Sequence, residues 1–264
     1  MKSLAATIAI SFALAFGSAS QAAGQQPEIL VSAAASLTDV LTGLSGQAER
    51  YIGAKVLFNF GGSGALRKQI EEGAPVDVFF SASAEDMVAL EAKGLLVAGT
   101  RRDLLSNGIV LIGGPTAVPV HGETAAAAIS ALKELLSSAD LLAIGNPDTV
   151  PAGRYAVRAL TTYGLYPVVK TKLALGGNVR EVLQYVQNGS APLGIVFATD
   201  LLAATPGSVR QVFAFPDDSV GGAILYPVAL IRASKNREKA LKMIAFLQSD
   251  AARNAFRAAG FILK

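Results

Sequence analysis

The chain has 264 residues, and its 23 lysines and arginines nearly balance its 20 aspartates and glutamates. The basic residues are scattered along the sequence, whereas a nucleic-acid-binding surface requires them to cluster. With no cysteine, one histidine and no acidic pairs at ligand spacing, the sequence argues against a disulfide framework and against a metal-cation site.

The first segment has the order of a secretory signal peptide: Lys2, the apolar run Leu4–Phe16, and then the small-residue stretch Gly17–Ala23. The apolar run is too short to span a bilayer. We therefore expect cleavage after Ala22 or Ala23, and the lack of cysteine excludes a lipid-modified cysteine at that site. The remaining chain, of about 240 residues and net charge about +2, is expected to be exported and soluble.

Short apolar runs alternate with helical patterns along the rest of the chain, as in α/β proteins built from βαβ units. Strands are predicted at Glu28–Ser32, Lys55–Phe60, Val76–Ser81, Gly108–Ile112, Leu141–Ile144, Lys172–Leu175, Gly194–Phe197, Gln211–Phe215 and Ile224–Ile231. Helices are predicted at Ser36–Arg50, Ser63–Glu72, Ala84–Lys93, Thr124–Ser137, Ala152–Tyr163, Val179–Gln187, Thr199–Ala203, Asn236–Gln248 and Ala251–Ala259.

Two of the predicted strands are each followed by small residues and a serine at a helix start, in Ala33–Ser36 and in Gly61–Ser63. A serine there offers a hydroxyl among backbone N–H groups that have no intrahelical partner, so two such starts can hold an anion without fixed charge. The glycines and alanines are expected to leave room for a ligand near the backbone. The same serines also fit helix caps, and Ser36 with Asp39 is close to a capping box, so both interpretations stay open.

Two later strand ends, Gly145–Gly153 and Gly176–Arg180, have the same character. Small or apolar residues there leave backbone N–H groups as the main donors. Ligands of open α/β sheets bind beyond the carboxyl ends of the strands, so these junctions are further candidates for a binding site.

Four runs in this order, AAASLTDVL, FGGSGALRKQIEEGAPVDVFFSAS, GNPDTVPAGRYAVRAL and APLGIVFATDL, resemble the periplasmic molybdate-binding proteins of ABC transporters. The resemblance extends from about Glu28 to Lys264. It implies the type II periplasmic binding-protein fold, with two α/β lobes, a ligand cleft between them and two hinge crossovers. It also implies a monomeric periplasmic protein, not an enzyme, that binds molybdate and tungstate without a cofactor. Such a protein delivers its anion to a membrane permease and, through it, to a cytoplasmic ATPase.

Residue by residue, the resemblance implies that Ser36 and Ser63 each give the anion a hydroxyl and a backbone N–H. It implies that Ala152 and Val179 each give a backbone N–H from the second lobe. Neutral donors in a dry cleft suit a fully deprotonated oxyanion and offer no acceptor to a protonated one such as hydrogen phosphate.

The chain departs from the family at Phe197, where the family has a tyrosine whose hydroxyl binds the anion. One donor is therefore missing from the predicted site. We expect either weaker binding than in tyrosine-bearing relatives or replacement of the donor by a nearby group such as Thr199 or by an ordered water.

Three charged residues lie near these positions in the sequence. Arg154 is expected to point to solvent from a helix that starts at Ala152. Asp77 and Asp148 would repel a dianion, and we interpret both as caps of loops or helices.

The predicted lobes follow from two crossovers, near Ser106–Gly108 and near Ser219–Ala223. After the signal peptide 1–23, lobe one takes residues 26–107 and 223–264, and lobe two takes residues 108–222. The lobes are expected to close over the ligand by a hinge motion.

Other functions stay open at this point. Gly61–Ala65 falls one residue short of the G-x-S-x-G nucleophile elbow, so a serine hydrolase using Ser63 is one alternative. The only histidine, His121, lies in a loop far from any predicted strand end, which disfavours a catalytic triad.

A binding protein for another tetrahedral oxyanion, such as sulfate, is a second alternative. A transcription-factor effector domain of this fold would carry a DNA-binding helix pair instead of a signal peptide.

Overall fold

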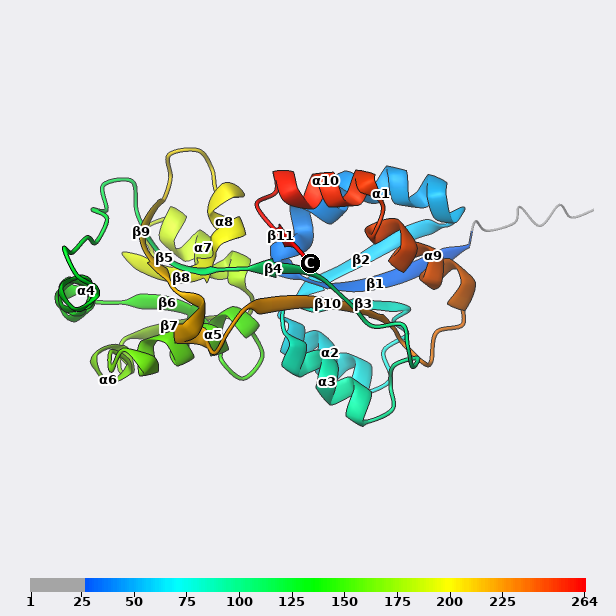
Figure 1. Ribbon diagram of the computed structural model, residues 1–264, viewed down its shortest axis with the longest axis horizontal. Helices are drawn as coiled ribbons and strands as arrows, with labels where there is room; N and C mark the ends of the chain where they lie inside the picture. Colours follow the sequence, from blue (N-terminus) through cyan, green and yellow to red (C-terminus); the bar gives the residue numbers. More distant parts are fainter. Residues whose placement is uncertain (1–26) are drawn as a thin grey trace, which may run out of the picture.

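The protein consists of two α/β lobes that lie side by side along the long axis of the molecule (Figure 1). The computed structural model describes residues 27–264, and the predicted signal peptide, residues 1–23, lies outside the described residues. In the part of the chain from residue 27 onward, no helix is both long enough and apolar enough to cross a membrane.

The first lobe is built on a six-stranded sheet with the order β11-β4-β10-β3-β1-β2. The strand β1 pairs in parallel with β2 and β3, whereas β10 runs antiparallel to β3 and β4. The strands of this sheet are β1 (Glu28–Ala34), β2 (Lys55–Gly61), β3 (Val78–Phe80), β4 (Arg102–Asn107), β10 (Ile224–Leu230) and β11 (Ile262–Leu263).

The second lobe is built on a five-stranded sheet with the order β7-β6-β8-β5-β9. The strand β6 pairs in parallel with β7 and β8, and β5 runs antiparallel to β8 and β9. The strands of this sheet are β5 (Ile109–Gly113), β6 (Leu142–Gly145), β7 (Leu173–Gly176), β8 (Leu193–Phe197) and β9 (Arg210–Phe215).

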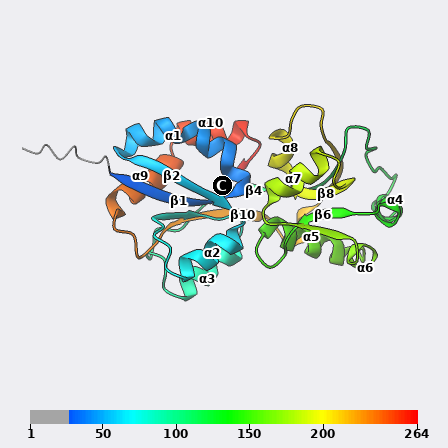
Figure 2. The same cartoon turned by 180° about the vertical axis from the view of Figure 1, so that it is seen from behind.

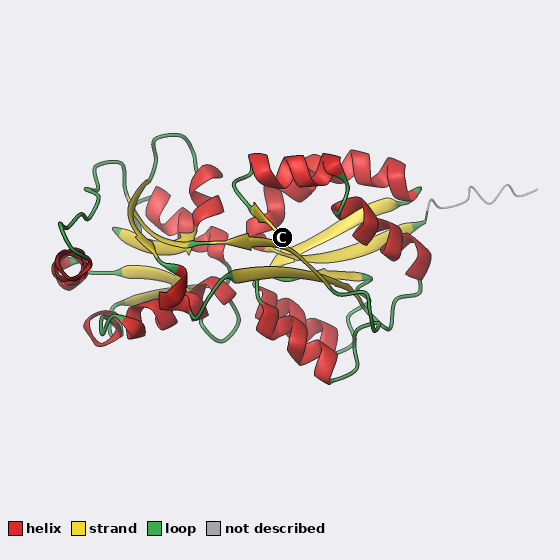
Figure 3. Ribbon diagram, viewed as in Figure 1, coloured by secondary structure: helices red, strands yellow, loops and turns green. Residues whose placement is uncertain are grey.

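Helices cover both faces of each sheet (Figure 3), as the view from behind also shows (Figure 2). One face of the first sheet carries α1 (Thr38–Ile52), α9 (Arg237–Leu247) and α10 (Asp250–Ala258), and the other face carries α2 (Ser63–Glu71) and α3 (Ala84–Ala92). The second sheet has α7 (Val179–Gln187) and α8 (Ala198–Leu202) on one face, α5 (Pro151–Thr162) and α6 (Tyr166–Val169) on the other, and α4 (Ala125–Ser138) at its outer end. Two short 3₁₀ helices, η1 (Ala35–Leu37) and η2 (Asp217–Val220), complete the described elements.

The predicted strands and helices are all present, with ends within two residues of the predicted ones. The helical segment after β1 buries one face, since Leu37, Val40, Leu41 and Leu44 all lie in the core. The sequence prediction missed β4, β11 and α6. The strand β4 has only two apolar residues, Leu104 and Leu105, and it forms because β10 and β11 pair with it from either side.

Two connections link the sheets. Gly108 alone separates β4 of the first sheet from β5 of the second, and the chain returns from β9 through η2 and Gly221–Ala223 to β10. Both connections lie at the predicted crossovers, and the fold is the two-lobed type II periplasmic binding-protein fold. The lobe boundaries at residues 107/108 and 222/223 stay a prediction.

The lobes touch through their backbones at the start of α2. The carbonyl oxygen of Thr149, in the loop before α5, accepts hydrogen bonds from the N–H groups of Gly64 (2.9 Å) and Ala65 (3.2 Å). A Cβ atom at Gly64, or one at Gly62, would lie only 2.8 Å from this oxygen. These glycines, predicted to leave room for a ligand, therefore make room for the opposite lobe.

We predict that Gly64→Ala opens the lobes without unfolding the protein. The added methyl group would collide with the Thr149 backbone, whereas alanine is favoured over glycine within a helix by about 1 kcal/mol. The amide of Ala65 is then expected to exchange with solvent about tenfold faster or more, as measured by hydrogen exchange.

Gly43→Ala is the matched control, because a Cβ atom at Gly43 of α1 would meet nothing within 4 Å. It should leave exchange at Ala65 unchanged. Equal exchange rates for the Gly64 and Gly43 variants would contradict the steric argument.

Candidate functional site

A small cavity between the lobes brings most of the predicted binding positions together. Ser36 lies in η1 after β1, and Ser63 opens α2 after β2. Val179 opens α7 after β7, and Phe197 ends β8. Ala152 is fully buried and directly follows Pro151, which lines the cavity. The remaining lining residues are Ala34, Ala35, Gly61, Gly62, Ala82 and Val150, so no charged side chain lines the cavity.

Three helices begin at this cavity: α2, α5 and α7. Most amides of their first turns have acceptors inside the protein. The carbonyl oxygen of Thr149 accepts hydrogen bonds from the amides of residues 64 and 65, and that of Val150 accepts from the amides of residues 153 and 154. The side-chain oxygen Oδ1 of Asn178 accepts from the amides of residues 180 and 181.

The amides of Ser63, Ala152 and Val179 have no acceptor among residues 27–264. They lie at the positive ends of three helix dipoles, where an anion is favoured. The amide of Ser36, in η1, likewise has no acceptor among these residues, so backbone donors are left at all four positions that the family resemblance implied.

Ser36 and Ser63 are both buried, with 4% and 0% of their surface exposed, and neither is a helix cap. The Oγ of Ser36 lies 3.0 Å from the hydroxyl of Tyr226, and no side chain caps the start of α1. The Oγ of Ser63 accepts a hydrogen bond from the N–H of Ala82 at 2.9 Å, and the cap position of α2 is Gly62. The capping interpretation of these serines is therefore wrong.

Phe197 lines the cavity and provides no hydroxyl. Its ring meets the ring of Tyr226 edge-on, with centroids 5.7 Å apart. Thr199, considered above as a replacement donor, accepts a hydrogen bond from Asn107 Nδ2 at 2.8 Å and lines a neighbouring, larger cavity.

Tyr226 belongs to this region and was not among the predicted site residues. Burial raises the pKa of Tyr226 well above its ordinary range, so its hydroxyl keeps its hydrogen. A signal was present in the sequence, since a tyrosine inside the apolar strand Ile224–Leu230 needs a partner for its hydroxyl.

Arg180 joins the two lobes beside the cavity. Its Nη1 lies 2.8 Å from Asp39 Oδ2 in lobe one, and its Nε lies 2.7 Å from Asp200 Oδ1 in lobe two. The contact with Asp200 is close, but its angle does not suit a hydrogen bond. Complete burial raises the pKa of Asp200 to about 6, and the Arg180 charge and the hydrogen bond from Phe197 N–H offset only part of the rise.

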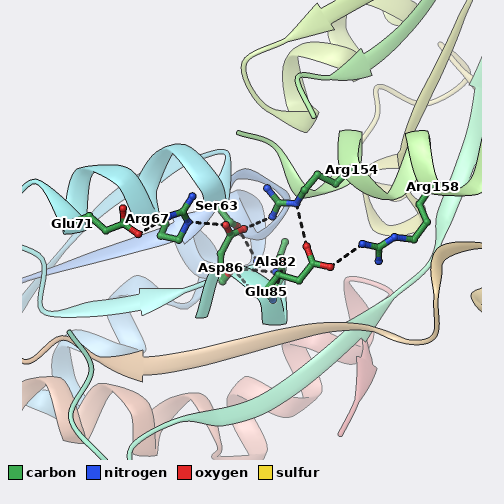
Figure 4. A network of polar contacts seen from close by, with 10 residues as sticks. Ser63, Arg67, Glu71, Ala82, Glu85, Asp86, Arg154 and Arg158 are labelled. Carbon is green, nitrogen blue, oxygen red and sulfur yellow. Dashed lines mark hydrogen bonds and ion pairs between the residues drawn. The ribbon is translucent and has the colours of Figure 1, made fainter. Parts of the chain in front are cut away.

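A second group of ion pairs joins the lobes on the α3 side (Figure 4). Arg154 of α5 pairs with the buried carboxylate of Asp86 and lies 3.6 Å from Glu85, and Arg158 Nη2 lies 2.8 Å from Glu85 Oε1. Arg67 holds Asp86 from within lobe one. The expectation that Arg154 points to solvent is wrong, because acidic residues of the opposite lobe draw its side chain across the interface.

Asp77 and Asp148 lie outside the cavity lining. Asp77 accepts hydrogen bonds from Leu30 N–H and from the hydroxyl of Ser234, which confirms its role as a loop cap. Asp148 is exposed, and its own N–H is capped by Asn146 Oδ1, so the capping side chain in this loop is the asparagine.

His121 lies in the exposed loop between β5 and α4, at the outer end of the second lobe (Figure 1), whereas Ser63 lies at the cavity between the lobes. Residues 27–264 also contain no cluster of three His, Asp or Glu side chains that could hold a metal ion.

The chain is similar to known solute-binding proteins. The family model for bacterial extracellular solute-binding proteins matches residues 29–262. The molybdate-binding protein ModA of Haemophilus influenzae is 38% identical over 240 residues, which cover 90% of this chain and 91% of the relative.

Solved structures are similar to this chain as well. The substrate-binding domain of a putative molybdenum ABC transporter from Clostridium difficile is 33% identical, with a TM-score of 0.64, and the match covers 90% of this chain and 99% of that chain. The periplasmic molybdate-binding protein of Azotobacter vinelandii shares the fold with a TM-score of 0.74 at 23% identity, over 89% of this chain and 99% of that chain. This chain belongs to the family of bacterial extracellular solute-binding proteins.

Proposed function

We propose that this protein binds molybdate, and tungstate as well, in the cavity between its lobes and delivers the anion to the membrane permease of an ABC importer. Ser36 and Ser63 each contribute a hydroxyl donor and a backbone N–H donor, and Ala152 and Val179 each contribute a backbone N–H donor. No resident cofactor takes part. The protein acts as an exported, periplasmic monomer after removal of its signal peptide, and the permease passes the anion on with energy from a cytoplasmic ATPase.

One observation carries this proposal: the unpaired amides of residues 36, 63, 152 and 179 and two buried serine hydroxyls lie at or next to a cavity that no charged side chain lines. Fixed dipoles of this kind stabilise a fully ionised oxyanion in a dry site. The relatives named for molybdate binding support the choice of this anion.

Hydrolysis by Ser63 is disfavoured by the position of the only histidine. The Oγ of Ser63 has the Ala82 N–H as its partner, which donates a hydrogen bond and cannot accept the proton that a nucleophilic serine must lose.

Titration calorimetry with molybdate, tungstate, sulfate and phosphate tests the proposed ligand. We expect tight binding of molybdate and tungstate and much weaker binding of sulfate, because a smaller anion leaves some donors without a partner at a cost of about 1–3 kcal/mol each. Sulfate binding equal to or tighter than molybdate binding would point to the alternative oxyanion.

Ser36→Ala and Ser63→Ala should each weaken molybdate binding by about tenfold to a hundredfold, since each removes a hydroxyl donor to a charged ligand worth about 1.5–3 kcal/mol. Calorimetry gives the affinity, and thermal melts without anion report the fold. A serine-directed phosphonate is expected to leave Ser63 unlabelled.

Ser249→Ala is the matched control, because Ser249 caps α10 by accepting a hydrogen bond from Ala252 N–H. It should lower the free energy of unfolding by about 1 kcal/mol and leave the affinity unchanged. If the two site variants behaved like this control, the assignment of the serines as ligand donors would be wrong.

A further inference from the structure

The hydroxyl of Ser36 lies at the end of a buried chain of hydrogen bonds that begins at the first crossover between the lobes. Asn107, the last residue of β4, donates from Nδ2 to Thr199 Oγ1 (2.8 Å) and to the hydroxyl of Tyr226 (3.1 Å). The Tyr226 hydroxyl lies 3.0 Å from Ser36 Oγ. The three residues that link the crossover to the cavity, Asn107, Tyr226 and Ser36, are at most 4% exposed.

The orientation of the Asn107 amide is fixed by its other end. Its Oδ1 accepts a hydrogen bond from the N–H of Gly108 at 3.0 Å. A flipped amide would turn Nδ2 toward this N–H, which places donor against donor. The amide nitrogen therefore faces Tyr226, and a nitrogen of this type only donates.

The direction of the remaining hydrogens follows from this donor. The hydroxyl of Tyr226 accepts from Asn107, and its single hydrogen goes to its other polar neighbour, Ser36 Oγ. Since Ser36 Oγ accepts this hydrogen, its own hydrogen must point elsewhere, and Ser36 lines the cavity between the lobes.

Ser63 shows the same arrangement with a different partner. Its Oγ accepts from the backbone N–H of Ala82, so its own hydrogen is also left for the cavity that it lines. In both serines, the Oγ atom accepts a hydrogen bond from the protein, so the hydroxyl hydrogen can be donated to a ligand.

We propose that Tyr226 and Asn107 are positioning residues that hold the Ser36 hydroxyl as a hydrogen-bond donor to the bound oxyanion. This inference rests on the proposed function of the cavity. Neither residue lines the cavity, so both act through Ser36. The anion then meets a donor whose direction is set before binding, which strengthens its hydrogen bond to a charged acceptor.

A double-mutant cycle with molybdate in titration calorimetry tests the inference. Tyr226→Phe keeps the ring packing on Phe197 and removes only the hydroxyl, so we expect about fivefold to tenfold weaker binding. In the Ser36→Ala background, the same substitution should change the affinity less than twofold, because no hydroxyl is left to orient. Equal losses in both backgrounds would show a structural role only and overturn the inference.

Tyr163→Phe is the control for loss of a tyrosine hydroxyl, since this ring stacks on Phe215 in lobe two and does not line the cavity. It should not change the affinity in either background. Thermal melts of the anion-free variants establish that each one folds.

Asn107→Asp provides a second route if Tyr226→Phe fails to fold. An aspartate in the same place accepts the hydrogen of Tyr226, so Ser36 must donate to Tyr226 and no longer to the anion. We expect at least tenfold weaker molybdate binding, and a clearly smaller loss in the Ser36→Ala background. A loss caused only by the added charge would be the same in both backgrounds and would overturn the inference.

If the unaltered protein binds another tetrahedral oxyanion in place of molybdate, the cycle is run with that anion and tests the same inference. Failure of the unaltered protein to bind any of the four oxyanions would overturn the proposed function and this inference together.

Discussion

The meeting of the two lobes depends on the carbonyl of Thr149, which lies over the first turn of α2 and accepts two of its amides. This contact requires the backbones to approach more closely than any side chain at Gly62 or Gly64 would allow. It also uses the amides next to Ser63, so that the amide of Ser63 itself stays free to face the cavity. The same contact therefore brings the two backbones close together and leaves one unpaired amide at the start of α2.

The charged side chains at the interface between the lobes lie beside the cavity and not in its lining. Arg154 and Arg158 pair with acidic residues of α3, and Arg180 pairs with Asp39 and Asp200 on the other side. These pairs cross from one lobe to the other, so they favour the arrangement in which the lobes are in contact. Because each cation already has an acidic partner, the cavity is left to neutral donors, and an anion shifts the lobes toward contact only by its own preference for the closed arrangement.

The polar groups around the cavity follow one pattern. Groups of the protein pair with the serine oxygens, which accept, and hydrogen-bond donors are left unpaired. Ala82 N–H occupies the oxygen of Ser63, and the Tyr226 hydroxyl neighbours the oxygen of Ser36. Unpaired donors in a buried site are costly, and an oxyanion removes that cost for several of them at once. Asn107 connects this pattern to the crossover between the sheets, so the site and the hinge share a buried side chain.

The sequence by itself predicted most of the elements and the strand ends that meet at the cavity. Hydrophobic spacing located those strands and helices, because its signals are local. Small residues at strand ends pointed to Ser36, Ser63 and two later junctions, and the family resemblance singled out Ala152 and Val179 within those junctions. The strand β4 was not predicted, because it forms by pairing with strands that are distant in the sequence. The direction of Arg154 was not predicted either, because its side chain pairs with an acidic residue of the other lobe. Whether a serine caps a helix or faces a cavity was also decided only by tertiary structure. That choice depends on which donor, from Tyr226 or Ala82, folding brings to its oxygen.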